Sequence, residues 1–139
     1  MRYALVDTGV WYAMFDPRDP YAGDIGKKAE ILTRCQVVVP WPTMYETLRT
    51  GFVNNGLALR RLQDYRKSPR VEYCDDDSYR RQALELSFSS ALRDRRPLSM
   101  VDCLIRLIMD DTNVNIALLA TFNARDFVDV CRRRRIELV

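Results

Sequence analysis

The sequence predicts an α/β fold, a three-layer α/β/α sandwich around a central, mostly parallel sheet of four or five strands. Short apolar runs rich in valine, isoleucine and leucine alternate with longer helical patterns along the chain. Strands separated by helices pair in parallel and are covered on both faces. The chain has 139 residues, of which 47% are hydrophobic, which suits one core and is short for two. We therefore expect residues 1–139 to form a single domain.

The expected strands are short and the expected helices separate them. Four strands begin at Tyr3 (YALVD), Gln36 (QVVVP), Arg70 (RVEYC) and Asn115 (NIALLAT), and a fifth short run, IELV, closes the chain. DPRDP, PWP, NNG and RRP interrupt the helical periodicity. The expected helices cover residues 8–15, 21–34, 43–54, 57–67, 77–93, 99–111 and 125–133.

The composition limits the chemistry that the chain can perform. The net charge is +3, from 22 basic and 19 acidic residues, so binding to a polyanion would have to be local. The chain contains no histidine, which excludes Ser-His-Asp and Cys-His catalysis and nearly all zinc hydrolase sites. Any catalysis must therefore depend on carboxylates.

Cysteine use and hydropathy suggest the compartment. Cys35, Cys74, Cys103 and Cys131 are widely spaced and form no Cys-x-x-Cys pair, so we expect reduced thiols in a cytoplasmic protein. No apolar run is long enough to span a bilayer, and the N-terminus lacks a signal-peptide pattern. No membrane association is expected.

Four acidic residues occupy positions where a site could form. Asp7 ends the first expected strand, Glu46 follows the second, and Asp126 follows the fourth. Asp102 lies in the first turn of the helix before the fourth strand. Active sites of doubly wound sheets lie beyond the carboxyl ends of the strands. These acids could therefore converge at one edge of the sheet.

Each acid also has a structural explanation. Thr43-x-x-Glu46 and Ser99-x-x-Asp102 match the capping box, in which an acid in the first helical turn reaches back to the cap residue. Asp7 could cap the helix that follows it, and Asp126 could be an acid favoured by the dipole of its helix.

The joint pattern favours a metal site over four separate caps. Converging carboxylates repel one another, so they remain ionised only beside a compensating cation. Mg²⁺ and Mn²⁺ accept carboxylate oxygens and retain waters. The sequence therefore predicts a Mg²⁺ or Mn²⁺ site.

Four segments, LVDTGVWYA, PTMYETL, LSMVDCLI and LLATFNARDF, resemble in order and spacing the motifs of PIN-domain nucleases, particularly the VapC-like toxins of type II toxin–antitoxin systems. The resemblance covers almost the whole chain, although residues 57–96 carry no motif. It implies that Asp7, Glu46, Asp102 and Asp126 are the catalytic and metal-binding acids. The first and third would be the core metal ligands, and Asp126 matches a fourth acid whose position varies in the family.

The resemblance also implies supporting residues, an activity and partners. Thr8 matches the hydroxyl residue after the first acid, Thr121 the hydroxyl residue that ends the fourth strand, and Asn123 a place where some members carry an aspartate. The implied activity is a Mg²⁺- or Mn²⁺-dependent endoribonuclease that hydrolyses RNA with metal-activated water and leaves 5′-phosphate and 3′-hydroxyl ends. A small antitoxin and a homodimer are the expected protein partners.

Other interpretations remain open at this stage. A receiver-type phosphoacceptor would need paired acids after the first strand and a late lysine, and an aspartyl phosphatase would need Asp-x-Asp; the chain has none of these. A catalytically silent RNA- or protein-binding module, or a stand-alone nuclease without an antitoxin, would retain the same fold. The aromatic-rich first helix, with Trp11, Tyr12 and Phe15, suits a core or a dimer contact. CRRRRIELV is either a phosphate-contacting patch or a solvated helix end.

Overall fold

A computed structural model describes all 139 residues and confirms the three-layer α/β/α sandwich. The five strands form one all-parallel sheet in the order β3-β2-β1-β4-β5. Each strand lies within two residues of its expected start. The strands are β1 (Arg2–Val6), β2 (Cys35–Pro40), β3 (Val71–Cys74), β4 (Ile116–Ala120) and β5 (Glu137–Leu138).

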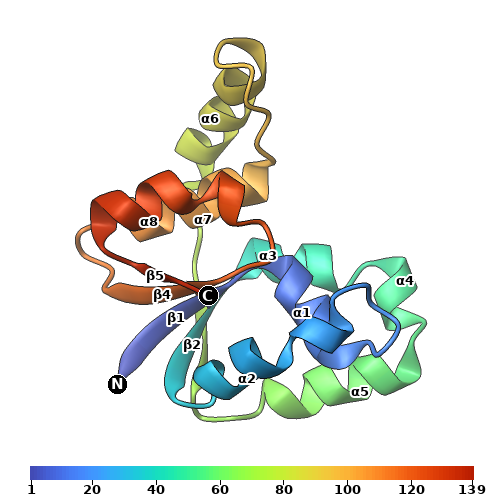
Figure 1. Cartoon of the computed structure of the whole chain (residues 1–139). Helices are drawn as coiled ribbons and strands as arrows, with labels where there is room; N and C mark the ends of the chain where they lie inside the picture. The colour runs from blue at the N-terminus through green and yellow to red at the C-terminus, as the bar shows by residue number, and fades with distance from the viewer.

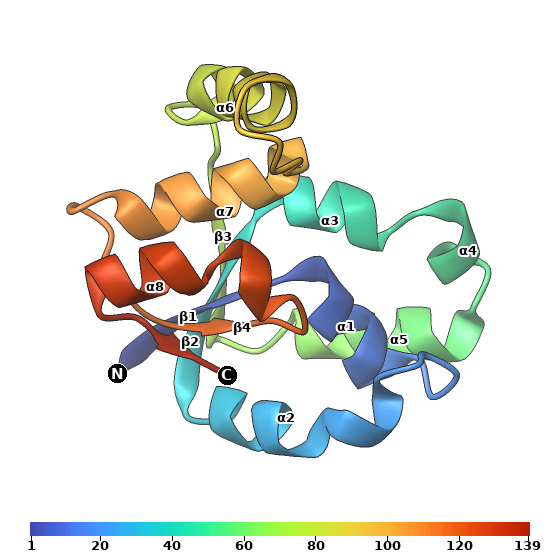
Figure 2. The ribbon, with the colours of Figure 1, turned by 45° about the horizontal axis from the view of Figure 1, so that its top comes forward.

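Helices cover both faces of this sheet. They are α1 (Thr8–Phe15), α2 (Gly26–Leu32), α3 (Trp41–Thr47), α4 (Thr50–Val53), α5 (Gly56–Tyr65), α6 (Arg80–Leu92), α7 (Met100–Asp110) and α8 (Val128–Arg134), with two 3₁₀ turns, η1 (Ala22–Asp24) and η2 (Ala124–Asp126). Figure 1 and Figure 2 show α7 and α8 on one face and α1, α2 and α5 on the other, while α6 stands out beyond α7. No helix has the length and apolar character that a membrane crossing requires.

The core divides into two layers because strand side chains alternate between the faces. Ala4 and Val6 of β1 face the first layer, where they pack with Trp11 and other residues of α1 and α5. Leu5 faces the second layer, which α7 and α8 close. Burial on both faces explains why the strands are almost continuously apolar.

The structure corrects the expected helix at residues 43–54. The chain forms α3 from Trp41 and a separate short α4, with a break at Leu48 and Arg49. PWP was expected to interrupt the helical pattern, but its last two residues belong to the first turn of α3. A proline is tolerated there because the first-turn N–H has no partner within the helix.

Two further helices begin later than expected, and the cysteines agree with expectation. The expected helix at 21–34 is divided into η1 and α2, and the one at 125–133 into η2 and α8. All four cysteines are free thiols; three are buried and Cys74 is half-buried.

The aromatic residues of α1 lie in the protein's own core. Trp11 and Phe15 are buried, and each ring packs edge-on against Tyr65 at the end of α5, with centroids 5.5 Å apart. Intramolecular packing therefore covers the side chains from which we predicted a dimer contact, and the dimer prediction loses this basis.

Candidate functional site

Asp7 lies at the topological switch point of the sheet, where the order of strand addition reverses. From β1 the chain adds β2 and β3 on one side, and β4 then pairs with the other side of β1. In open α/β sheets, ligands bind beyond the carboxyl ends of the strands at such a switch point, and we call this end of the sheet the crevice. Asp7 follows β1 at this crevice, and its backbone N–H donates to the carbonyl of Ala120 at the end of β4 (2.9 Å).

The Asp7 carboxylate accepts two hydrogen bonds. One oxygen accepts from the Thr8 backbone N–H (2.8 Å), as expected for the N-cap of α1. The other accepts from the buried Thr121 hydroxyl (2.8 Å) at the end of β4. Capping therefore uses one oxygen, while the other joins Asp7 to the neighbouring strand.

Glu46 reaches Asp7 through Thr8. The Thr8 hydroxyl donates to Glu46 Oε1 (2.6 Å), while the Thr8 backbone holds Asp7. The predicted capping box at Thr43 is wrong, because Thr43 is buried within the first turn of α3 and its hydroxyl donates to the Pro40 carbonyl (2.7 Å). Glu46 lies near the end of α3, where its carboxylate is free to face α1.

Asp126 reaches Asp7 through Thr121 from the opposite side. The Asn123 backbone N–H donates to the Thr121 hydroxyl oxygen (2.9 Å), and the Asn123 side-chain amide donates to the Asp126 carboxylate. Asp126 lies in η2, before α8 begins, and is not a first-turn residue of that helix. Hydrogen bonds through Thr8 on one side, and through Thr121 and Asn123 on the other, therefore link Glu46, Asp7 and Asp126.

Asp102 approaches the same crevice from α7. Its backbone N–H donates to the Ser99 hydroxyl oxygen (3.0 Å), so Ser99 is the N-cap as the capping box predicted. Asp102 is not a member of the hydrogen-bonded chain. Burial, followed by the charge of Asp7, raises the pKa of its carboxyl, and the charge of Asp126 adds to this shift.

Asp7 also titrates above its ordinary range. Burial is the largest cause of its raised pKa, and the hydrogen bonds from Thr121 and Thr8 oppose it. The charges of Glu46 and Asp126 raise this pKa further. The four predicted acids therefore lie close enough to influence one another, and the repulsion between them contributes to the raised pKa values of Asp7 and Asp102.

The donor set has the chemistry of a hard-cation site. All four acids offer oxygen, which Mg²⁺ and Mn²⁺ prefer, and a cation would relieve the repulsion that raises the pKa of Asp7 and Asp102. The structure contains no group of three or more His, Cys, Asp or Glu side chains placed to hold an ion together. Since Mg²⁺ retains several waters and often takes only one or two carboxylates, the residues present still fit this ion.

Sequence reasoning missed the arginine that anchors the Asp126 segment. Arg106 Nη1 donates to the backbone carbonyl of Asp126 (2.7 Å), and both terminal nitrogens of Arg106 hold the Asp129 carboxylate (2.7 Å each). Arg96 adds bonds to Asp129 and to the Arg125 carbonyl (3.0 Å). The only sequence signal was that Arg106 follows the site acid Asp102 by four residues, a spacing that puts both side chains on the same face of a helix.

Sequence reasoning also missed the role of Tyr12 at the Glu46 side. Its hydroxyl donates to the backbone carbonyl of Glu46 (2.6 Å), and the guanidinium of Arg49 lies over its ring, 4.8 Å from the centroid. We expected Tyr12 to be core or a dimer contact, but it is half-buried and connects α1 to the end of α3.

The arginine run near the C-terminus is only partly free. Arg133 forms an ion pair with Asp110 of α7 (2.8 Å), and Arg135 ends α8 in the left-handed conformation, with φ 55°. Arg133 and Arg135 therefore belong to the end of α8, which an ion pair joins to α7.

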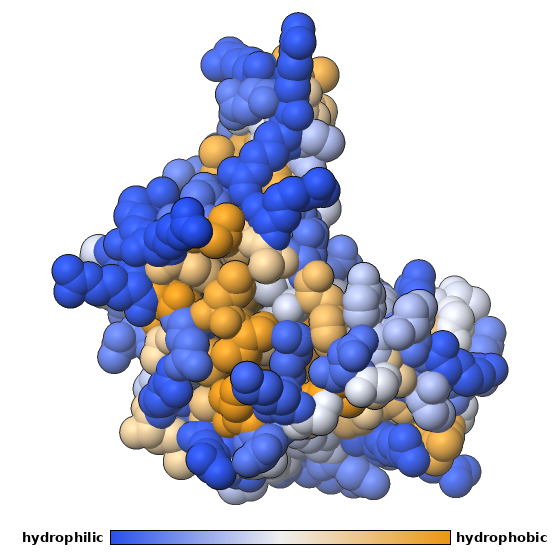
Figure 3. Space-filling view, viewed as in Figure 1, coloured by the Kyte–Doolittle hydropathy of each residue, from blue (hydrophilic) through white to orange (hydrophobic).

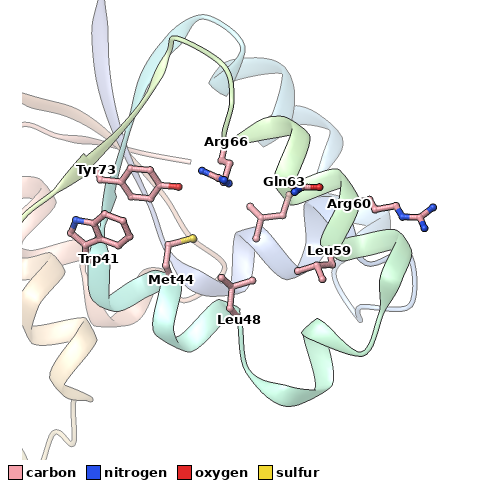
Figure 4. Close-up of a pocket in the computed structure, with 9 residues that line it drawn as sticks. Trp41, Met44, Leu48, Leu59, Arg60, Gln63, Arg66 and Tyr73 are labelled. Atoms are coloured by element: carbon pink, nitrogen blue, oxygen red, sulfur yellow. The ribbon is translucent and has the colours of Figure 1, made fainter.

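A separate apolar pocket of about 450 Å³ lies between α3, α5 and β3. Figure 4 shows Trp41 beside Tyr73 at one end and Leu48 and Leu59 at the other; the rings of Trp41 and Tyr73 stack with centroids 4.3 Å apart. No acidic residue lines this pocket, so it suits an apolar partner and not the chemistry of the carboxylates.

Comparison with known proteins gives no family for the chain. A scan against protein-family models finds no match, and neither does a search of curated proteins. The function proposed below therefore rests on the residues and geometry of this chain.

Proposed function

We propose that this protein is a Mg²⁺- or Mn²⁺-dependent endoribonuclease that hydrolyses RNA phosphodiester bonds. The observation that carries the proposal is the hydrogen-bonded chain that joins Glu46, Asp7 and Asp126 across the switch point of the sheet. Asp102 adds a fourth carboxylate that responds to the same charges. Asp7, Asp102 and Asp126 are half-buried and Glu46 is exposed. Carboxylates gathered in this way raise the energy of the empty site, which is the arrangement expected where a cation binds.

Each side chain of the site has its own proposed role. Asp7 and Asp102 are the proposed direct ligands, because they are the acids whose burial a cation would compensate most. Glu46 and Asp126, held by Thr8 and Asn123, would complete the site and orient water. Thr121 fixes the Asp7 carboxylate through its hydroxyl. When bound, the ion would lower the pKa of a water and offset charge that builds on the phosphate.

The proposal is tested by RNA cleavage with purified wild-type protein and an Asp7→Asn variant. The wild type should cut a defined single-stranded RNA in the presence of Mg²⁺ or Mn²⁺ and stop when EDTA is added. Asp7→Asn should lose cleavage by a factor of about 10² or more, because the carboxylate charge is lost while the shape remains. A folded Asp7→Asn protein that cuts RNA as fast as the wild type, from preparations cleared of contaminating nuclease, would falsify the assignment.

A protein partner forms the second part of the proposal. The pocket between α3, α5 and β3 has an apolar lining, and two of its residues, Arg60 and Arg66, form no ion pair. A small antitoxin that offers an apolar segment with acidic neighbours would suit this lining. Co-expression with the product of the adjacent gene tests this: the partner should co-purify and suppress cleavage. A nuclease that no neighbouring product binds would instead be a stand-alone enzyme.

A further inference from the structure

Two aromatic rings stack beside the acidic crevice. Phe122 lies between Thr121, whose hydroxyl holds Asp7, and Asn123, whose amide holds Asp126. The ring of Tyr21 stacks on that of Phe122, with centroids 4.5 Å apart and planes 10° from parallel. Tyr21 precedes η1 and is 47% exposed. The exposed ring of Tyr21 therefore rests on Phe122, which adjoins in sequence the two residues that contact Asp7 and Asp126.

Two cations lie on aromatic rings next to the same crevice. Lys28 Nζ of α2 is 4.8 Å from the centroid of Phe122, and Arg49 lies at the same distance from the centroid of Tyr12, whose hydroxyl holds Glu46. Neither cation forms an ion pair with a carboxylate. The structure contains these two cation–π pairs. The ring of one belongs to Phe122, between Thr121 and Asn123, and the ring of the other belongs to Tyr12, which binds the Glu46 backbone carbonyl.

An apolar surface lies between α8 and α2 (Figure 3). Figure 3 shows hydrophobic side chains gathered over the sheet between α8 and α2, on the face where the chain ends. Phe122 and Val139 are partly buried residues packed on the layer beneath. Packing on this layer accounts for Phe122, but it does not account for the half-exposed ring of Tyr21 that covers it.

The geometry points to a binding platform for single-stranded RNA, in which Tyr21 on Phe122 stacks a base beside the acids and Lys28 and Arg49 contact phosphates on the two sides of the crevice. This inference rests on the proposed function. Exposed aromatic rings with neighbouring cations are the usual means of holding single strands, because every base has a face to stack. Both faces of a base are covered in a duplex, so the platform selects unpaired RNA at the point of cleavage.

The experiment measures binding apart from cleavage. Every variant is made in an Asp7→Asn parent, and the affinity for a fluorescein-labelled single-stranded RNA is measured by anisotropy in Mg²⁺ at several salt concentrations. Tyr21→Ala should weaken binding roughly tenfold or more, the loss typical of one stacked base, whereas Tyr21→Phe should bind as the parent does. Lys28→Ala should lower the slope of log Kd against log salt by about 0.7, the value for one phosphate contact on a single strand.

Two matched controls separate the platform from general effects. Tyr3→Ala removes a partly exposed tyrosine at the opposite end of β1 from Asp7, and Lys67→Ala makes the same change in net charge at the end of α5. Both should bind RNA as the parent does. Melting curves verify that every variant is folded.

The possible results separate this inference from the proposed function. If wild-type protein cuts RNA but Tyr21→Ala binds no more weakly than Tyr3→Ala, or if the parent binds a duplex of the same sequence as tightly as the single strand, the platform is wrong and the nuclease remains. If RNA binds through Tyr21 but wild-type protein cuts none with either metal, the nuclease is wrong and the platform remains.

Discussion

At the scale of single residues, Asp7 combines a structural and a chemical task. One of its oxygens caps α1 and the other accepts from Thr121, so removing the side chain and removing only its charge should have different consequences. Asparagine caps a helix about as well as aspartate, and its amide nitrogen can donate to the Thr121 hydroxyl in place of the bond that Asp7 accepts there, whereas alanine can do neither.

Asp7→Ala should therefore have a free energy of unfolding about 1 kcal/mol or more below that of Asp7→Asn. Both should abolish cleavage, because neither carries a carboxylate. Urea denaturation of the two variants in EDTA checks the first expectation and RNA cleavage the second. Equal losses of stability in Asp7→Asn and Asp7→Ala would mean that the charge, and not the cap, stabilises α1.

The raised pKa values of Asp7 and Asp102 predict how stability depends on pH without metal. Both lie above the ordinary value of 3.8 in the folded protein, so the folded state holds these protons to higher pH than the unfolded chain. The stability that these two groups contribute is fully present below pH 3.8, where both are protonated. It is lost as the pH rises through their pKa values in the folded protein. Denaturation in EDTA between about pH 4 and 7 should show a shallower fall for Asp7→Asn than for the wild type, and parallel curves would contradict the assignment of the shift to Asp7.

At the scale of elements, the joint between α7 and α8 holds the Asp126 segment in place. Arg106 of α7 binds Asp129 of α8 through two bonds and the Asp126 carbonyl through a third. The hydrogen bonds from Arg106 lower the pKa of Asp129, and burial opposes this shift only in part. The ionised Asp129 carboxylate therefore adds to the free energy of unfolding above its ordinary pKa of 3.8. This contribution is lost as the pH falls through the pKa of Asp129 in the folded protein.

Asp129→Asn should lower the free energy of unfolding by about 1–2 kcal/mol at neutral pH, a range that allows for the partly exposed carboxylate of Asp129. The difference from the wild type should shrink below about pH 4, where Asp129 begins to protonate in the unfolded chain. Cleavage should also fall, because η2 loses its anchor. Arg133→Gln, which removes an ion pair between the C-terminal turns of α7 and α8 that makes no hydrogen bond to η2, is the matched control and should leave cleavage unchanged.

The sequence predicted best the elements whose hydrophobic pattern fits only one type of secondary structure. The apolar strands and α1, from Thr8 to Phe15, agree with the structure, and the meeting of the acids follows from the shared carboxyl edge of parallel strands. The break between α3 and α4 was missed because neither Leu48 nor Arg49 is a helix-breaking residue. Arg106 was missed because its contacts lie about twenty residues away in the chain, at Asp126 and Asp129.

At the scale of the whole molecule, a bound ion should stabilise the fold by mass action. A ligand that binds only the folded state adds about 2.7 kcal/mol at a hundredfold excess over its Kd, a rise of roughly 5–10 °C in Tm for a chain of this size. Mg²⁺ or Mn²⁺ at millimolar concentration should produce this shift in the wild type and not in Asp7→Asn or Asp102→Asn. The same shift in all three proteins would place the ion elsewhere, and no shift in the wild type would count against the metal site.

The molecule exposes one apolar stripe that its own chain does not cover. Leu84, Phe88 and Leu92 follow one another at four-residue spacing on α6 and are 44%, 60% and 79% exposed. Residues spaced by four lie on one face of a helix, and α6 projects from the body beyond α7 (Figure 1). Ala83 and Ser90, on other sides of the helix, are buried. The expected homodimer therefore has a more plausible contact here than on α1.

We expect two copies to pack their α6 stripes together about a twofold axis, because a self-complementary apolar patch is covered by its own symmetry mate. Light scattering at micromolar concentration should give twice the chain mass of 16.3 kDa, and Phe88→Glu should give a monomer, since a charge on each copy would be buried opposite its equivalent. Leu57→Glu places the same charge on an exposed leucine of α5 and should remain dimeric. Because Phe88 contributes to neither buried core layer, Phe88→Glu should keep its melting temperature when compared at a concentration where both proteins are monomeric. A wild type of monomer mass, or a Phe88→Glu protein that still has the dimer mass, would exclude this contact.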